Sequence, residues 1–168
     1  MCKTSECVLG YRDQKSHVLA GGDMGRDEKH VADNLTGGCQ CGGVRYALRG
    51  APIKTYVCHC RECQMQSASA FGISVLVRPH DIEVVKGKPK IWARPTEGGV
   101  PMPCYFCGEC GSRLFHGDLK GDAAVSVKGG SFDTPVNLQG AMHIWTKRKL
   151  AGVVIPDDAV SFAGDPDC

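Results

Sequence analysis

Three thiols within six residues form the densest group of metal-ligating side chains in this sequence: Cys58, Cys60 and Cys63, spaced C-x-C-x-x-C. One metal ion can collect all three without a ligand from a distant part of the chain. Structural zinc is usually held by four protein ligands, whereas catalytic zinc usually has three and keeps its fourth position for water or substrate. The spacing therefore predicts an open zinc site on these three cysteines.

Two further cysteine pairs lie well before and well after this group. Cys39 and Cys41 form a C-x-C pair, and Cys107 and Cys110 form a C-x-x-C pair, with glycines around both. Together they supply four thiols, so we predict a closed structural zinc that pins distant parts of the fold together. Cys104 could compete with this second pair, but side chains alternate along a strand, so Cys104 should face away from Cys107.

The total of eleven cysteines in 168 residues would suggest disulfides in a secreted protein. Residues 1–33 lack the apolar core of a secretory signal, so metal binding is the better account, with two zinc ions per chain. A redox-active C-x-x-C or scattered buried thiols are the alternatives. We expect Cys2, Cys7, Cys104 and Cys168 to be free thiols.

Composition and charge bound the remaining function classes. A formal charge of +2 and no block of like charges argue against a dedicated nucleic-acid binder. No apolar run approaches the roughly 18 residues of a membrane span, so we expect a soluble cytoplasmic protein. Residues 1–33 are polar and aperiodic and should form a flexible extension, in which Met24 could be a second translation start, and residues 34–168 should form one domain.

The elements that position the cysteines should be short strands divided by turn residues. Apolar and polar positions alternate over residues 44–49, which indicates a half-buried strand, and Val75 to Val77 should be buried on both faces. One helical turn fits residues 64–69. Further strands are expected over 54–57, 71–77, 82–85, 90–93, 104–106, 113–116, 123–127 and 143–145. The pattern predicts a mainly β domain of two folded sheets with zinc knuckles.

The motifs taken together are similar to the glutathione-dependent formaldehyde-activating enzyme family, which includes the centromere protein V type. The resemblance covers roughly residues 35 to 162 and is carried by the segments 38–42, 58–63, 106–112 and 143–145. It implies a fold like that of Rab-binding zinc exchange factors, with structural zinc on the first and third cysteine groups and a labile zinc on Cys58, Cys60 and Cys63. It also implies carbon-sulfur lyase chemistry that joins formaldehyde and glutathione, or splits their adduct. The sequence departs from the family at Ser67-Ala68-Ser69, where a Ser-Gly or Thr-Gly step is common.

The chemistry of the open site agrees with this class of reaction. Three thiolates on Zn²⁺ leave a net charge near −1, which makes the ion a weak Lewis acid for water. A sulfur-rich site prefers another soft ligand, so an incoming thiol would bind as its thiolate at neutral pH. The same site stabilises a thiolate leaving group when a carbon-sulfur bond breaks.

Side chains near the open site have simpler interpretations. We expect His59 to point away from the metal, with support of the site or a general-acid role as the alternative, and His116 and His143 to be structural rather than catalytic. Arg61 and Glu62 are either a solvated pair or substrate contacts. The basic triplet 147–149 is either solvated or holds the carboxylates of glutathione. Two other functions remain open: a non-enzymatic zinc module that binds protein or nucleic acid, and a redox or metal-buffering protein.

Overall fold

The computed structural model describes residues 35–166 apart from Glu97 and Asp122. The predicted extension over residues 1–33, with Met24, Cys2 and Cys7, lies outside this part of the chain, as does Cys168. None of the described helices is long and apolar enough to cross a membrane.

The described residues form short strands and one short α-helix, as the turn-rich sequence predicts. The strands are β1 Leu35–Gly38, β2 Arg45–Leu48, β3 Lys54–Cys58, β4 Gly72–Val77, β5 Ile82–Lys86, β6 Lys90–Arg94, β7 Met102–Phe106, β8 Arg113–His116, β9 Val125–Lys128 and β10 Met142–Ile144, and the helix is α1 Arg61–Ser67.

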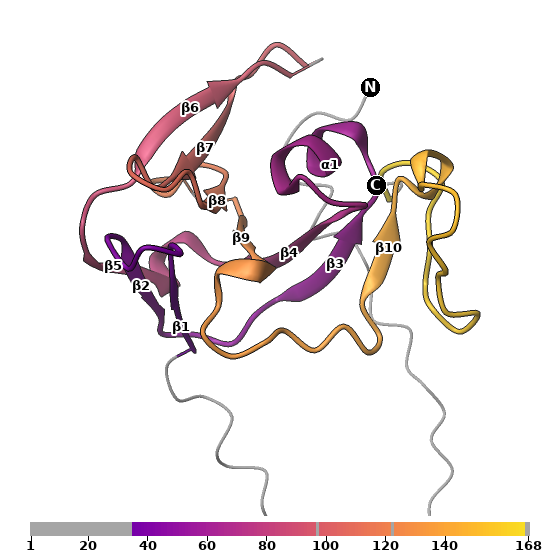
Figure 1. Ribbon diagram of the computed structural model, residues 1–168, viewed down its shortest axis with the longest axis horizontal. Helices are drawn as coiled ribbons and strands as arrows, with labels where there is room; N and C mark the ends of the chain where they lie inside the picture. Colours follow the sequence, from indigo (N-terminus) through magenta and orange to yellow (C-terminus); the bar gives the residue numbers. More distant parts are fainter. Residues whose placement is uncertain (1–34, 97, 122, 167–168) are drawn as a thin grey trace, which may run out of the picture.

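Two sheets build the fold. One has the strand order β1-β2-β5, and the other has the order β10-β3-β4-β9-β8-β7-β6. All neighbouring strands are antiparallel except β10, which pairs with β3 in parallel. Helix α1 lies against the β3–β4 part of the larger sheet (Figure 1). The edge strands of that sheet are β10 and β6. The prediction of a mainly β fold with two sheets is confirmed.

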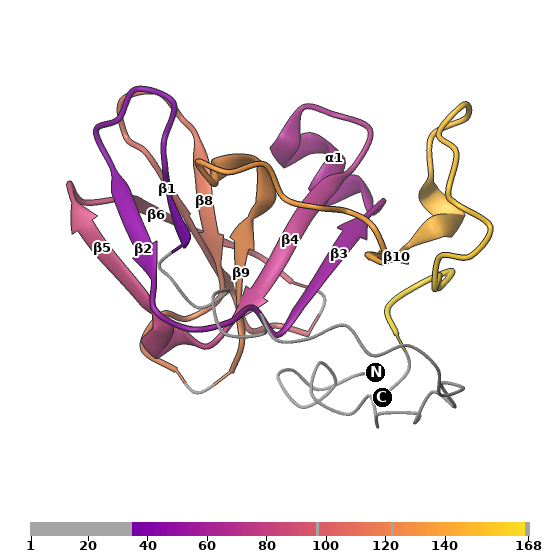
Figure 2. The same cartoon turned by 90° about the horizontal axis from the view of Figure 1, so that it is seen from below.

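The main core lies between the sheets. Tyr46 and Leu48 of β2 are buried and pack in one cluster with Val75 of β4, Phe115 of β8 and Val127 of β9. The three-stranded sheet covers the β8–β9 part of the larger sheet and lies away from β10 (Figure 2). The apolar positions of the predicted alternation over residues 44–49 therefore lie on the side of β2 that faces this core.

A second apolar cluster lies where β3, β10 and α1 meet. Cys58, Met142 and Ile144 are its buried members, and Tyr56, Cys60, Cys63, Trp145 and Phe162 pack against it. Three of these residues are the cysteines of the predicted open site. The site is thus built on one end of the larger sheet and not in a loop that stands apart from the core.

Candidate functional site

The structure brings together the four cysteines of the predicted closed site. Cys39 and Cys41 follow β1, while Cys107 and Cys110 lie in the turn between β7 and β8. One hairpin belongs to the three-stranded sheet and the other to the seven-stranded sheet. The cluster therefore joins the two sheets at one point.

The sulfur positions of this group fit a tetrahedral ion. All four lie within 4.8 Å of one another, with 3.5 Å between Cys39 Sγ and Cys41 Sγ and 3.7 Å between Cys41 Sγ and Cys107 Sγ. With zinc–sulfur bonds of about 2.3 Å, neighbouring ligands of a tetrahedron lie about 3.8 Å apart. Cysteine sulfurs at this spacing suit Zn²⁺, and they could hold it without rearrangement.

The turns around these cysteines supply donors to the sulfurs. Gly42 and Gly111 adopt φ of 70° and 74°, a conformation that glycine reaches at little cost and that lets each turn close tightly. The Val44 amide donates to Cys39 Sγ at 3.1 Å. Hydrogen bonding to Ser112 lowers the pKa of the Cys110 thiol to about 5. The turn thus favours a thiolate at Cys110, and the thiolate is the form that binds a metal. At Cys41 the hydrogen bond to the Gly43 backbone lowers the pKa, but the neighbouring sulfurs outweigh it and raise the pKa to about 12.

Cys104 lies outside this cluster, as strand alternation predicts. Its side chain is fully buried in β7, and its thiol donates to the Met102 carbonyl at 3.5 Å. The metal-competent group in this part of the structure consists of Cys39, Cys41, Cys107 and Cys110.

The cysteines of the predicted open site also meet. Cys58 ends β3, Cys60 is the residue before the first turn of α1, and Cys63 lies in that turn. Their three sulfurs lie within 4.8 Å of one another, and no fourth His, Cys, Asp or Glu of the described residues joins them. Gly72 of β4 lies against this group, and a Cβ there would lie 3.1 Å from the Cys63 Cβ, which is tighter than an ordinary contact.

Local hydrogen bonds favour a thiolate in this group as well. Cys60 Sγ caps α1 by accepting from the Cys63 amide at 3.4 Å. Hydrogen bonds from Cys58 and then Cys63 lower the pKa of the Cys60 thiol to about 2. Three closely spaced soft donors fit a zinc ion with one position left for another ligand.

Buried polar contacts fix the segment that carries these cysteines. The side-chain amide of Gln64 donates to the backbone carbonyls of His59, at 2.8 Å, and Arg148, at 2.9 Å. His59 is fully buried and stacks on His143, with 3.0 Å between His59 Nε2 and His143 Nδ1. Burial lowers the pKa of both imidazoles. His59 therefore belongs to the support of the site and not to the sulfur group.

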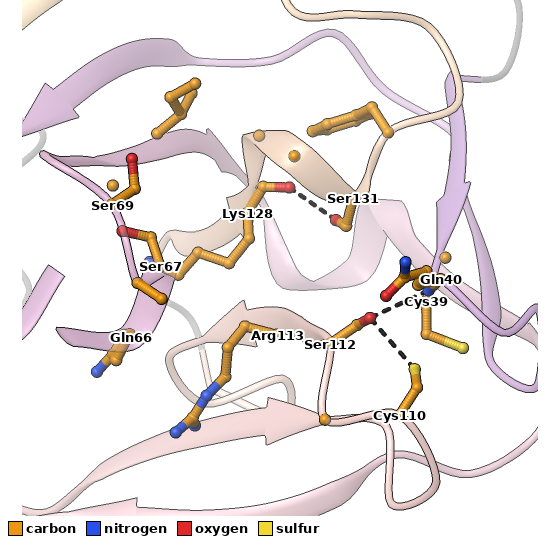
Figure 3. Close-up of a pocket in the computed structure, with 18 of the residues that line it drawn as sticks. Cys39, Gln40, Gln66, Ser67, Ser69, Cys110, Ser112, Arg113, Lys128 and Ser131 are labelled. Atoms are coloured by element: carbon orange, nitrogen blue, oxygen red, sulfur yellow. Dashed lines mark hydrogen bonds between the residues drawn. The ribbon is translucent and has the colours of Figure 1, made fainter. Parts of the chain in front are cut away.

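A cavity of about 970 Å³ opens beside the three-cysteine group and extends toward the four-cysteine group. Its volume is in the upper part of the range for small-molecule sites. Cys63 lies on its wall together with Phe71, and Cys39 and Cys110 line it farther along. Figure 3 shows Ser112 in this wall, bonded to Cys110 and to the Gln40 backbone.

Two cations of the cavity wall were not found by sequence reasoning. Lys128 ends β9 and donates to Ser74 Oγ at 3.3 Å, and Arg113 begins β8. Burial lowers the pKa of the Lys128 ammonium, and the sulfurs of Cys63 and Cys58 oppose that shift. The sequence carried one signal: a lysine after the strand pattern Val-Ser-Val must share the polar face of β9 with Ser126.

The other charged candidates lie elsewhere. Lys147 and Arg148 stack over the Trp145 ring, at 4.8 and 4.9 Å from its centroid, and no residue of the triplet 147–149 lines the cavity. Arg61 and Glu62 do not pair with each other: Arg61 donates to Gln64, and Glu62 lies 3.8 Å from Arg94. His143 is partnered, whereas buried His116 Nε2 has no hydrogen-bond partner among the described residues.

Comparisons with known proteins found a family and a similar solved structure. A solved structure from Rhodobacter sphaeroides is 21% identical, covers 62% of this chain and 93% of its own, and superposes with a TM-score of 0.49. The curated proteins contain no match to this chain. The sequence model of the family described as glutathione-dependent formaldehyde-activating enzyme matches residues 34–148, a region that holds all seven clustered cysteines. The chain therefore belongs to the glutathione-dependent formaldehyde-activating enzyme family.

Proposed function

We propose that this protein is a zinc-dependent carbon-sulfur lyase that forms or cleaves a thiol-aldehyde adduct such as S-(hydroxymethyl)glutathione. Membership of the family supports the class of reaction. The observation that carries the proposal is the group of three sulfurs, within 4.8 Å of one another and beside a large cavity. Three ligands and an adjoining cavity are what a metal-bound substrate requires.

Each cysteine group has its own task in this proposal. Cys39, Cys41, Cys107 and Cys110 hold the structural zinc, and Cys58, Cys60 and Cys63 hold the catalytic one. When bound at the second group, zinc supplies an open coordination position that stabilises a thiolate at neutral pH.

The reaction itself requires a carbon-sulfur bond to form without any change of oxidation state. The thiolate sulfur attacks the aldehyde carbon, the electron pair of the C=O π bond moves to oxygen, and that oxygen takes up the proton that the thiol lost. Cleavage is the same sequence in reverse. In this proposal the chemistry occurs at the cavity wall that Cys63 and Phe71 line, and the Gln64 contacts hold the cysteine-bearing segment in place.

Open coordination also distinguishes this proposal from a non-enzymatic binding module. Such a module is stabilised by a closed site and gains nothing from a three-ligand group on a cavity wall. The four-cysteine group would be enough to hold the two sheets together.

The test is turnover of glutathione and formaldehyde by the zinc-loaded full chain. We expect the wild type to accelerate adduct formation and Cys60→Ser to lose at least a hundredfold in kcat/KM. Serine still caps α1 in that variant, because its hydroxyl can accept from the Cys63 amide. A fully zinc-loaded wild type with no acceleration for glutathione or other small thiols would contradict the proposal.

A further inference from the structure

Two cations of the cavity have no carboxylate partner in the described part of the chain. Neither Lys128 nor Arg113 forms an ion pair with a described carboxylate. The Arg113 guanidinium instead lies over the rings of Trp92 and Phe106, at 5.6 and 5.4 Å from their centroids. A partly buried cation is costly, so an anion in the cavity would stabilise Arg113, and it would stabilise Lys128 in addition to the sulfurs of Cys63 and Cys58.

Hydrogen-bonding atoms at the same place are also without partners. Arg113 Nη1 is buried and makes no hydrogen bond within the described residues, and the same is true of Gln66 Oε1 on α1. Figure 3 shows Lys128 and Arg113 reaching from the larger sheet toward Gln66 and Ser67. Buried polar atoms left unpaired cost about 1–3 kcal/mol each, so this part of the wall is suited to a polar ligand.

Sheet register places the lysine close to the three-cysteine group. Tyr56, Ser74 and Lys128 lie side by side across β3, β4 and β9, and Cys58 pairs with Gly72 in the next row on the same face. Rows two residues apart on a strand are separated by about 7 Å. A ligand whose sulfur faces Cys63 can therefore place a group several bonds away against the ammonium of Lys128.

Among the described residues, the opposite part of the cavity has no cation without a carboxylate partner. Arg45 also lines the cavity, but its guanidinium is paired with Asp133, which in turn accepts from Thr36. That end is neutralised by the protein itself. Lys128 and Arg113 are thus the cations of the wall that remain available to a ligand.

We propose that Lys128 and Arg113 form a carboxylate subsite that selects thiol substrates carrying a carboxylate group several bonds from the sulfur. Arg113 offers a planar pair of donors that matches a carboxylate, and Lys128 offers a point charge nearer the cysteines. The part of this inference that concerns sulfur rests on the proposed function, whereas the carboxylate contact does not.

The test measures binding by titration calorimetry with the zinc-loaded full chain. The probes are 3-mercaptopropionate, neutral 2-mercaptoethanol, and S-methylglutathione, which keeps its carboxylates but has no free thiol. We expect the wild type to bind 3-mercaptopropionate at least tenfold more tightly than 2-mercaptoethanol, and Lys128→Met to reduce that ratio below threefold. Lys120→Met, on an exposed turn, is the matched control and should keep the full ratio.

Further variants separate a charge effect from a structural one. Lys128→Arg should restore most of the preference, and Arg113→Gln should weaken S-methylglutathione about tenfold; this second variant serves if Lys128→Met does not fold. Equal affinity of the wild type for the two mercapto compounds would overturn the subsite. S-methylglutathione binding that is lost with Lys128→Met, without any thiol effect at the metal, would uphold the subsite and contradict the proposed function instead.

Discussion

One buried histidine on the polar face of the larger sheet, His116, lies in a strongly positive environment. His116 is buried, its Nε2 has no partner among the described residues, and Lys128, Arg113 and Arg94 surround it with positive charge. Burial first, and then these three cations, lower the pKa of His116 to about 2. The imidazole is therefore neutral in the folded protein at every pH at which the protein would be studied.

This histidine should make stability depend on pH in the acid range. The unfolded chain takes up a proton near pH 6.5 while folded His116 does not, so its stabilising effect is complete above pH 6.5 and declines as the pH falls. The loss at pH 5.5 should be about 1.4 kcal/mol. Denaturant unfolding at pH 7.5 and 5.5 should show at least this loss in the wild type, because the lowered pKa values of His59 and His143 add to it, and a smaller loss in His116→Gln. Identical losses in the two proteins would contradict the assignment.

At the scale of elements, α1 places two of the three cysteines of the open group, and its ends explain how. Cys60 caps its first turn, and Ala68 ends it in the left-handed conformation, with φ of 48°. The Ala68 and Ser69 amides bond back to the carbonyls of Met65 and Gln64. This is the helix ending for which glycine is usually used, because alanine in that conformation is strained by about 1–2 kcal/mol.

Replacing this alanine should stabilise the protein. Ala68→Gly relieves the strain, and the extra freedom of glycine in the unfolded chain offsets part of the gain, so we expect about 0.5–1 kcal/mol. Ala93→Gly, in the middle of exposed strand β6, is the control and should destabilise by a similar amount. Thermal unfolding of the two variants should therefore shift in opposite directions. A lower melting temperature for Ala68→Gly would show that the left-handed ending is not strained.

Sequence patterns predicted those helices and strands whose formation depends on neighbouring residues in the chain. Alternation at Val44, Tyr46 and Leu48 identified the buried face of β2, and the apolar run at 75–77 is buried on both faces. Helix α1 begins at Arg61, earlier than the predicted turn, because Cys60 acts as its cap. Strand β1 was missed, because its glycine-rich sequence has little strand propensity and forms only by pairing with β2.

In the candidate site, the cysteine groups could be predicted from the sequence, whereas the cations of the cavity wall could not. Short spacings were enough to group the cysteines. Lys128 and Arg113 come from two strands and meet the α1 segment only in the folded sheet. Nothing in the spacing of those residues indicates a cavity.

At the scale of the whole molecule, the proposal gives one sulfur cluster the task of joining the two sheets and gives the other the chemistry. The four-cysteine group links the β1–β2 hairpin to the β7–β8 hairpin, and thus one sheet to the other. The three-cysteine group lies within the larger sheet and α1 alone. Loss of metal from the two groups should therefore have different consequences.

Serine variants of the two groups should separate fold from function. A structural zinc contributes on the order of 10 kcal/mol, comparable to the whole stability of a domain, so Cys39→Ser should unfold or aggregate. Cys60→Ser should lose one zinc and keep its fold. Circular dichroism melting with zinc analysis would show the difference. A soluble Cys39→Ser protein that melts like the wild type would rule out the structural role of that cluster.

The most direct test of the account asks what occupies the open position at Cys58, Cys60 and Cys63. Cobalt should replace zinc in both groups, and thiolate-to-cobalt charge-transfer absorption reports each added sulfur ligand. We predict that glutathione strengthens this absorption in the wild type, that S-methylglutathione does not, and that Cys60→Ser shows no response. An unchanged spectrum on adding glutathione or any small thiol, with the three-cysteine group fully loaded, would mean that this position does not take a substrate thiolate.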